Sequence, residues 1–302
     1  MTTITDQHEE SQTWLETLEH DAEERGYYQP LGKHHAALFS DEGTNLLVTF
    51  ERAEDIRARD GQPLAWAMTK GTDWSSLCLV ADKDSWFRDR FVYGYFDRLV
   101  DDGFLEDFDR VVFYGAGMGG YAATAFSVVA PGAVVLAVEA QATLDTTIAG
   151  WDKRFPALRR TSFSDRYGYG PDMSENAESV FLFFDPENRE DSMHASLFRN
   201  DNARPVPCSH MAGQIEHALV TMKIMPKLLQ LAMDGDLSKD AFCRLYRARR
   251  CYFPYLRRLL HVLESAGRSQ RVIWLCNSVV TRLRAPRFRK ARERARRALK
   301  RG

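Results

Sequence analysis

The feature that most constrains the fold is a 28-residue segment, residues 111–138, that contains no charged residue and no histidine. Its length exceeds the roughly 20 apolar residues that a membrane-spanning helix needs. However, several glycines and a Pro-Gly pair interrupt the segment, and such residues mark turns. The segment therefore predicts a strand over 111–114, a helix over 118–129 and a strand over 133–138, and it argues against a membrane span.

Short apolar runs elsewhere predict further strands of the same sheet, at residues 46–50, 77–80, 180–184 and 204–207. Between them a helix is predicted over 86–105, and the spacing of its aromatic residues is that of a buried helix face: Phe87, Phe91, Tyr95 and Phe96. Apolar strands that alternate with helices are typical of a mainly parallel sheet covered on both faces. The predicted fold class is α/β, with a helical extension at the C-terminal end.

Charge divides the chain into unlike parts. Residues 241–302 hold 19 Lys and Arg against two Glu, whereas residues 1–240 hold 22 basic and 40 acidic residues. Together with the helix and strand patterns, this predicts an acidic N-terminal helix (1–29), an α/β domain (30–235) and a basic helical extension (236–302). The basic run at 286–302 predicts an anionic partner, which could be nucleic acid, a membrane surface or an acidic protein. A solvated or internally paired helix is the alternative.

Composition places the chain among soluble globular proteins, with 44% hydrophobic and 27% charged residues. The five cysteines form no Cys-x-x-Cys pair, so neither a disulfide framework nor a thiolate zinc site is indicated. Residues 1–10 lack the basic and apolar regions of a secretory signal. These features predict a cytoplasmic protein with reduced thiols.

The glycine cluster after the 111–114 strand has two interpretations. In the first, Gly115, Gly117 and Gly120 form a G-x-G-x-x-G motif between a strand and a helix, and Glu139 closes the next strand 24 residues after Gly115. This is the dinucleotide fingerprint, in which bare glycines admit a pyrophosphate and the acid binds a ribose hydroxyl. It predicts NAD, NADP or FAD as cofactor of an oxidoreductase.

In the second interpretation the same turn is a nucleophile elbow, G-x-S-x-G, in which Gly117 takes the place of the serine. The elbow needs small residues at the positions of Gly115 and Gly119 because the backbone turns sharply from strand to helix. Two strands precede this turn. Downstream, Asp185 follows the later strand at 180–184 and His210 follows the one at 204–207, which is the order of a hydrolase triad. Context therefore favours the elbow.

The residues Tyr114-Gly-Ala-Gly-Met-Gly-Gly-Tyr121 and Asp185-Pro186 resemble those of the α/β-hydrolase superfamily over about residues 40–220. The resemblance implies an α/β-hydrolase fold. It also implies roles for single positions: Gly117 as the degenerate nucleophile position, Asp185 as the acid, His210 as the base, and the amides of Met118 and of a residue near Phe50 or Glu51 as the oxyanion hole. Glycine has no side-chain atom that could attack a substrate. With Gly117 in place of the serine, the chain therefore lacks the nucleophile that hydrolysis by this superfamily uses.

Similar chains are sometimes labelled phosphoadenosine phosphosulfate reductase, but the Ser-Gly-Gly phosphate loop and the Glu-Cys-Gly motif of that family are absent from the sequence. Other chemistry is weakly indicated. Cys208 and Ser209 adjoin His210 but need a tight turn to reach its ring, and Asp191 with His194 is a lone i, i+3 pair. No metal site is predicted.

These observations favour a binding or scaffold pseudoenzyme of α/β-hydrolase fold that lacks the serine nucleophile and needs no cofactor. Two alternatives stay open. One is a hydrolase of an acyl or similar small substrate that uses Asp185 and His210 with water or an unidentified nucleophile. The other is the dinucleotide-dependent oxidoreductase of the first interpretation.

Overall fold

A computed structural model describes residues 17–211 and 213–300. Its centre is an eight-stranded sheet in the order β1-β2-β4-β3-β5-β6-β7-β8. Strands β3 to β8 pair in parallel, while β2 runs antiparallel to both of its neighbours. The strands are β1 (Gly26–Leu31), β2 (His35–Ser40), β3 (Asn45–Arg52), β4 (Trp74–Ala81), β5 (Arg110–Ala116), β6 (Val134–Val138), β7 (Ser179–Phe184) and β8 (Ala203–Pro207).

The central strands are apolar throughout because both of their faces are covered. In β5, Val111 and Phe113 join one hydrophobic core, whereas Val112 and Tyr114 join another on the opposite face of the sheet. Successive side chains of a strand point to opposite faces, so this division follows from the pleat. The mainly parallel α/β sheet predicted from the sequence is confirmed.

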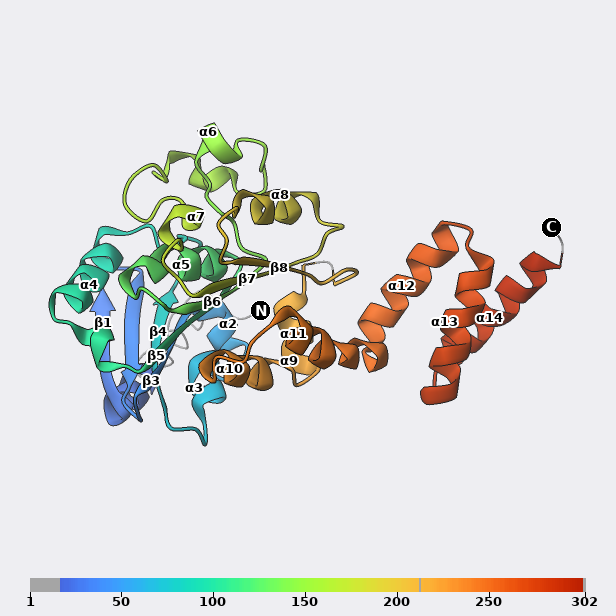
Figure 1. The fold of residues 1–302 in the computed structure, drawn as a ribbon, viewed down its shortest axis with the longest axis horizontal. Helices are drawn as coiled ribbons and strands as arrows, with labels where there is room; N and C mark the ends of the chain where they lie inside the picture. Colours follow the sequence, from blue (N-terminus) through green and yellow to red (C-terminus); the bar gives the residue numbers. More distant parts are fainter. Residues whose placement is uncertain (1–16, 212, 301–302) are drawn as a thin grey trace, which may run out of the picture.

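Helices lie on both faces of the sheet, so the α/β domain has three layers (Figure 1). Helices α4, α5, α7 and α8 cover one face, and α2, α3, α9, α10 and α11 cover the other (Figure 1). The bounds are α2 (Ala53–Arg57), α3 (Leu64–Thr69), α4 (Arg90–Asp101), α5 (Met118–Phe126), α6 (Thr146–Ala149), α7 (Gly170–Met173), α8 (Arg189–Leu197), α9 (Ile215–Thr221), α10 (Met225–Met233) and α11 (Lys239–Tyr246). The short 3-10 helices are η1 (Phe104–Asp107), η2 (Ser127–Val129), η3 (Pro156–Arg160) and η4 (Arg247–Cys251).

The predicted helix over 86–105 is shorter in the structure. Asp89 accepts a hydrogen bond from the Phe91 amide and caps α4, which therefore begins at Arg90, while Phe87 precedes it with a φ of 54°. Phe87, Tyr95 and Phe96 are buried as expected, but Phe91 is 46% exposed. Phe91 is thus a surface residue and not part of the core.

The N-terminal part of the chain differs from the expected single helix. Residues 17–25 are helical, but β1 begins at Gly26 and pairs with β2, so the range 1–29 contains both a helix and the start of a strand. The rest of the predicted acidic helix, residues 1–16, lies outside the described residues.

Three helices follow the sheet domain and form a separate hydrophobic core: α12 (Phe253–Ser265), α13 (Ser269–Arg282) and α14 (Pro286–Leu299). We call residues 253–300 the three-helix unit. It extends away from the sheet domain (Figure 1). By contrast α11 packs on the sheet, where Phe242 lies 5.1 Å from Phe183 between ring centroids. The separate core therefore includes α12, α13 and α14, whereas α11 packs with the sheet domain.

Among residues 17–211 and 213–300, no helix combines the length and the hydrophobicity that crossing a bilayer requires. The apolar segment 111–138, the one stretch whose length raised that question, is divided between β5, α5, η2 and β6.

Candidate functional site

The turn between β5 and α5 has the geometry of an elbow. Gly117, at its apex, has φ 55° and ψ −119°, a region that L side chains rarely occupy. A Cβ at Gly115 would lie 2.1 Å from the Gly119 carbonyl oxygen, and one at Gly119 would lie 2.3 Å from the Phe50 carbonyl oxygen. A Cβ at Gly117 would meet nothing within 4 Å. The strand and helix are therefore as close as bare glycines allow, and the apex faces open space.

The elbow stands where the chain order of the strands reverses. Strand β3 lies between β4 and β5, so the crevice at the carboxyl ends of β3 and β5 is the switch point at which open α/β sheets bind ligands. A cleft of about 300 Å³ opens beside the elbow, and we call it the elbow cleft. It is lined by Ala116, Glu139, Gly213, Gln214, Glu216 and His217.

Glu139 is a strongly perturbed group in the elbow cleft. It follows β6 with a φ of 50°, and its Oε2 accepts a 3.4 Å hydrogen bond from the Ile215 amide. Its Oε1 is buried and has no hydrogen-bond partner among the described residues. Burial, assisted by the Asp191 carboxylate, raises the pKa of Glu139 to about 7. Glu139 therefore changes charge near neutral pH, a property common in functional sites.

Glu216 is the second acid in the elbow cleft, and it is tied to the sheet. The Tyr114 hydroxyl donates a 2.6 Å hydrogen bond to Glu216 Oε1. Burial raises the pKa of Glu216, although the Tyr114 hydrogen bond opposes that effect. No basic residue except His217 lines the cleft, so its described wall is acidic to neutral.

Asp185, the predicted acid, lies fully buried at the end of β7. Its Oδ2 accepts a 2.8 Å hydrogen bond from the Met211 amide, and its Oδ1 accepts one of 3.0 Å from the Glu187 amide. These bonds fix the turns after β7 and β8. Asp185 therefore has a structural role, whatever role its carboxylate has in a reaction.

His210, the predicted base, is positioned by the segment after β8 with a φ of 66°. Its Nδ1 lies 2.8 Å from Glu187 Oε1. The ring lines a second cleft, of about 240 Å³, together with Tyr252, Tyr255 and Arg258 at the root of the three-helix unit. The acid that His210 contacts among the described residues is therefore Glu187. The cleft that His210 lines is not the elbow cleft.

The two predicted oxyanion donors have different surroundings. Met118 is the first residue of α5, where the leading amides of a helix have no intrahelical carbonyl to bind. Near the other position, the Glu51 carboxylate accepts hydrogen bonds from the Leu64 and Ala65 amides and forms an ion pair with Arg59. No sequence pattern indicates this capping role of Glu51 at α3.

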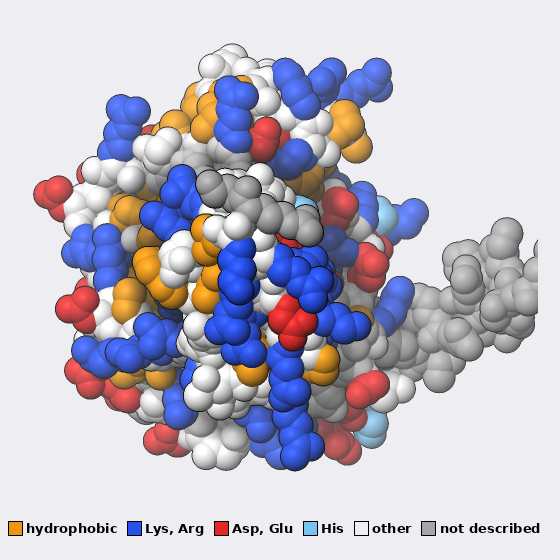
Figure 2. Space-filling view, turned by 90° about the vertical axis from the view of Figure 1, so that its right-hand side faces the viewer, with side chains coloured by type: hydrophobic (Ala, Val, Ile, Leu, Met, Phe, Trp, Pro, Cys, Tyr) orange, Lys and Arg blue, Asp and Glu red, His pale blue; other side chains and the backbone are white. Residues whose placement is uncertain are grey.

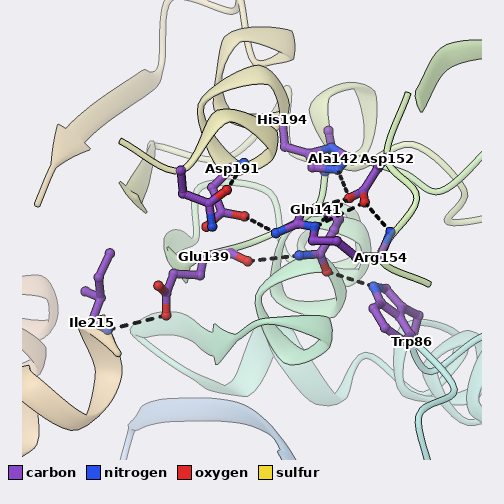
Figure 3. Close-up of polar contacts among 10 residues, drawn as sticks. Trp86, Glu139, Gln141, Ala142, Asp152, Arg154, Asp191, His194 and Ile215 are labelled. Carbon is purple, nitrogen blue, oxygen red and sulfur yellow. Dashed lines mark hydrogen bonds and ion pairs between the residues drawn. The ribbon is translucent and has the colours of Figure 1, made fainter. Parts of the chain in front are cut away.

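A buried polar network holds the loop after β6 in place (Figure 3). Gln141 links two parts of it, because its side-chain amide donates to the Glu139 carbonyl (3.0 Å) and its oxygen accepts from the Trp86 indole (2.9 Å). The backbone amide of Ala142 donates to His194 Nδ1 (3.2 Å), so the ring proton of a neutral His194 is on Nε2, 3.0 Å from Asp152 Oδ2. Both nitrogens of His194 are therefore engaged.

Arg154 joins two buried carboxylates in this network, at 2.7 Å from Asp152 and 2.7 Å from Asp191. Burial would raise the pKa of Asp152, but hydrogen bonds from His194 and Arg154 outweigh it and hold that pKa low. Burial raises the pKa of Asp191, although Arg154 opposes it. The Asp191 and His194 pair seen in the sequence thus belongs to an ion cluster. Within the described ranges no group of three His, Cys, Asp or Glu residues is arranged to hold a metal ion.

The strand order, the antiparallel β2 and the elbow after β5 define a protein of α/β-hydrolase fold. No family model and no curated protein sequence matches the chain.

Three solved structures illustrate its similarity to known proteins. The chain is similar to Est1E from Butyrivibrio proteoclasticus (9% identity, 69% of this chain and 98% of that chain, TM-score 0.44). It is also similar to an S-formylglutathione hydrolase from Agrobacterium tumefaciens (11%, 68% and 91%, TM-score 0.46) and to the capsule O-acetyltransferase of Neisseria meningitidis serogroup A (11%, 66% and 93%, TM-score 0.43). At such identities and scores these likenesses carry no inference about activity.

Proposed function

We propose that this protein is a pseudoenzyme of α/β-hydrolase fold that binds its ligand at the elbow cleft without forming a covalent intermediate. The observation that carries the proposal is the apex of the elbow. Its backbone has the strained turn that presents a nucleophile, yet Gly117 has no side chain and faces open space. A serine triad needs a hydroxyl that loses its proton to the imidazole, and Gly117 has none.

The neighbouring side chains support the same proposal. Cys208, one of the alternative nucleophiles, is fully buried, and burial raises the pKa of its thiol to about 12. Because the thiolate is the reactive form, such a cysteine is a poor nucleophile at neutral pH. Asp185 holds two backbone amides, and His210 pairs with Glu187 in another cleft.

Hydrolysis by an activated water is the second candidate function, and Glu139 is the observation that favours it. A general base works best when its pKa is near the operating pH, and the pKa of Glu139 is about 7. In such a reaction Glu139 would take a proton from water as the oxygen attacks a carbonyl carbon, and would return that proton to the leaving group. Turnover that is lost in Glu139→Gln would support this candidate over the first.

The dinucleotide alternative concerns Gly115, Gly117, Gly120 and Glu139. In the structure Gly115 is required by the close approach of the Gly119 carbonyl, so strand and helix packing alone accounts for it. Calorimetry of the native protein with NAD, NADP and FAD tests this alternative. A dissociation constant below about 10 μM that Gly117→Ser abolishes would favour it, because a side chain there obstructs a pyrophosphate.

The first prediction tests the proposed function at the elbow. We expect the native protein to form no adduct with a fluorophosphonate and to hydrolyse activated esters at the rate of buffer. Gly117→Ser should gain slow hydrolysis, about 10-fold to 100-fold above that rate, because an added Cβ has space and amide donors stabilise the oxyanion. The measurement is p-nitrophenyl acetate hydrolysis together with adduct mass.

Gly117→Ala is the matched control, since it adds the same backbone strain without a hydroxyl, and it should stay at the buffer rate. Native turnover that disappears in His210→Ala would overturn the proposal, because it would show a working base and a nucleophile elsewhere in the site.

A further inference from the structure

The three-helix unit carries a dense positive charge that its own acids do not neutralise. It holds fourteen Lys and Arg against two Glu, Glu264 and Glu293. Arg294 pairs with Glu264 at 2.8 Å, and Arg258 lies 3.7 Å from Glu187. The remaining basic side chains of the unit have no acidic partner among the described residues, and nearly all of them are exposed. Such a surface attracts a polyanion.

Part of this charge is arranged as a row along α14. Arg287, Lys290, Arg294 and Arg297 recur at intervals of three and four residues, so they share one helix face. Successive cations are separated by roughly 4.5 to 6 Å along the axis, and the row is about 15 Å long. The buried face of α14 adjoins the row, about 100° round the helix axis, because Phe288, Ala291 and Ala295 each follow a row residue by one position and are buried in the core of the unit. Packing therefore holds the row toward solvent.

A cleft at one end of the unit adds a place for a single anionic group. It measures about 330 Å³ and lies where α12 ends and α13 begins, against the C-terminal half of α14. Arg268 and Arg294 line it beside Ser269, the first residue of α13. Glu264 also lines this cleft and pairs with Arg294, so only Arg268, beside the positive end of the 14-residue α13, is left to meet an anionic group there.

The apolar residues of the unit decide between a nucleic acid and a membrane. A helix that lies on a bilayer inserts an apolar face, but that face of α14 is already buried in the unit. Trp274 is different, since it lies on α13 near Arg271 in the sequence and is 62% exposed. An exposed indole beside cations is a platform for base stacking. Figure 2 views the molecule from the side on which the three-helix unit lies in Figure 1, and it shows many Lys and Arg side chains on that face.

We propose that the three-helix unit binds the phosphate backbone of a single-stranded nucleic acid, independently of sequence, through the α14 row and Trp274. The proposal does not depend on the ligand of the elbow cleft. Phosphate contacts position the strand along the row, and stacking on Trp274 favours unpaired bases over a duplex.

The test is fluorescence anisotropy of a labelled 20-nucleotide oligo(dT) with the full chain. Raising KCl from about 50 to about 200 mM should weaken binding about 50-fold, because four phosphate contacts on a single strand each contribute a slope near −0.7. The quadruple variant Arg287→Gln, Lys290→Gln, Arg294→Gln and Arg297→Gln should lose most of this affinity and most of the salt dependence. Trp274→Ala should weaken binding about tenfold and leave the salt slope unchanged.

Matched variants keep the test decisive. Neutralising four exposed cations of the sheet domain instead, Lys33, Lys83, Arg159 and Arg160, should change affinity less than twofold. Replacing Arg287, Arg294 and Arg297 by lysine keeps the charge and should retain binding, which separates lost charge from lost folding. Equal binding by the glutamine and native proteins would overturn the proposal. So would tighter binding to vesicles that contain phosphatidylserine than to the oligonucleotide, with the same dependence on the row.

Discussion

Replacing Arg154 by leucine is expected to lower the free energy of unfolding by about 3 kcal/mol at pH 8. The guanidinium lies between Asp152 and Asp191, whose side chains are 0% and 3% exposed. Removing one partner of a buried ion pair leaves an uncompensated charge, which costs about 3 to 5 kcal/mol. We expect the lower end because the Arg154 side chain itself is 31% exposed. Urea unfolding of the two proteins measures the difference.

Acid should reduce this loss, because without Arg154 both carboxylates take up protons more readily in the native state. The loss at pH 5 should therefore be smaller than the loss at pH 8. Arg154→Lys is the matched control and should be less destabilising, since it keeps the charge but not the two-pronged geometry. Adding Asp191→Asn to Arg154→Leu should recover part of the stability. A loss that is independent of pH would contradict this electrostatic account.

The cluster matters for the elbow because it fixes the loop that carries Glu139. His194 accepts a hydrogen bond from the Ala142 amide, and the Gln141 side chain donates one to the Glu139 carbonyl (Figure 3). Glu139 therefore belongs to a loop that hydrogen bonds hold at several points. A support of this kind is what a binding site needs to present a carboxylate in one place.

Most of the sheet can be predicted from the sequence because its central strands are buried on both faces. All six predicted strands are present, and each differs from its observed bounds by a few residues at most. Strands β1 and β2 are not predicted, since β1 contains Gly26 and Pro30, which weaken a strand signal. Pro30 is tolerated because β1 lies at the edge of the sheet, where an amide hydrogen is not required for pairing on one side.

The candidate site is harder to predict because its contacts join residues distant in sequence. Small residues at 115 and 119 do indicate the elbow, since a sharp turn leaves a local pattern. Asp152 and Arg154 leave no such local pattern. The partner of Arg154, Asp191, lies 37 positions further along the chain, and the partner of Asp152, His194, lies 42 positions further along. The roles of Asp185, His210 and Met118 remain predictions. The ring of His210 contacts Glu187 of the same domain, and the cleft that it lines depends on how the root of the three-helix unit lies beside the sheet domain.

Glu139→Gln is expected to stabilise the protein at pH 8 by up to about 3 kcal/mol and to have little effect near pH 4.5. The pKa of Glu139 rises from 4.5 to about 7 on folding, mainly because of burial. Between these two pH values the native state binds the proton more tightly than the unfolded chain, so stability falls as the pH rises through this range. A pKa difference of one between the folded and unfolded states corresponds to about 1.4 kcal/mol. Glutamine resembles the protonated acid and avoids the loss.

The measurement is urea unfolding of native and variant proteins at pH 5, 6, 7 and 8, with the exposed Glu106→Gln as the matched control. Groups that titrate elsewhere cancel in the difference between the two proteins, so the difference should grow with pH and level off above about pH 7. A carboxylate retained at this cost to stability is expected in a binding or catalytic site, where function and stability compete. A stability difference that is constant over this range, or a variant less stable at pH 8, would show that the Glu139 carboxylate is not buried as the structure describes.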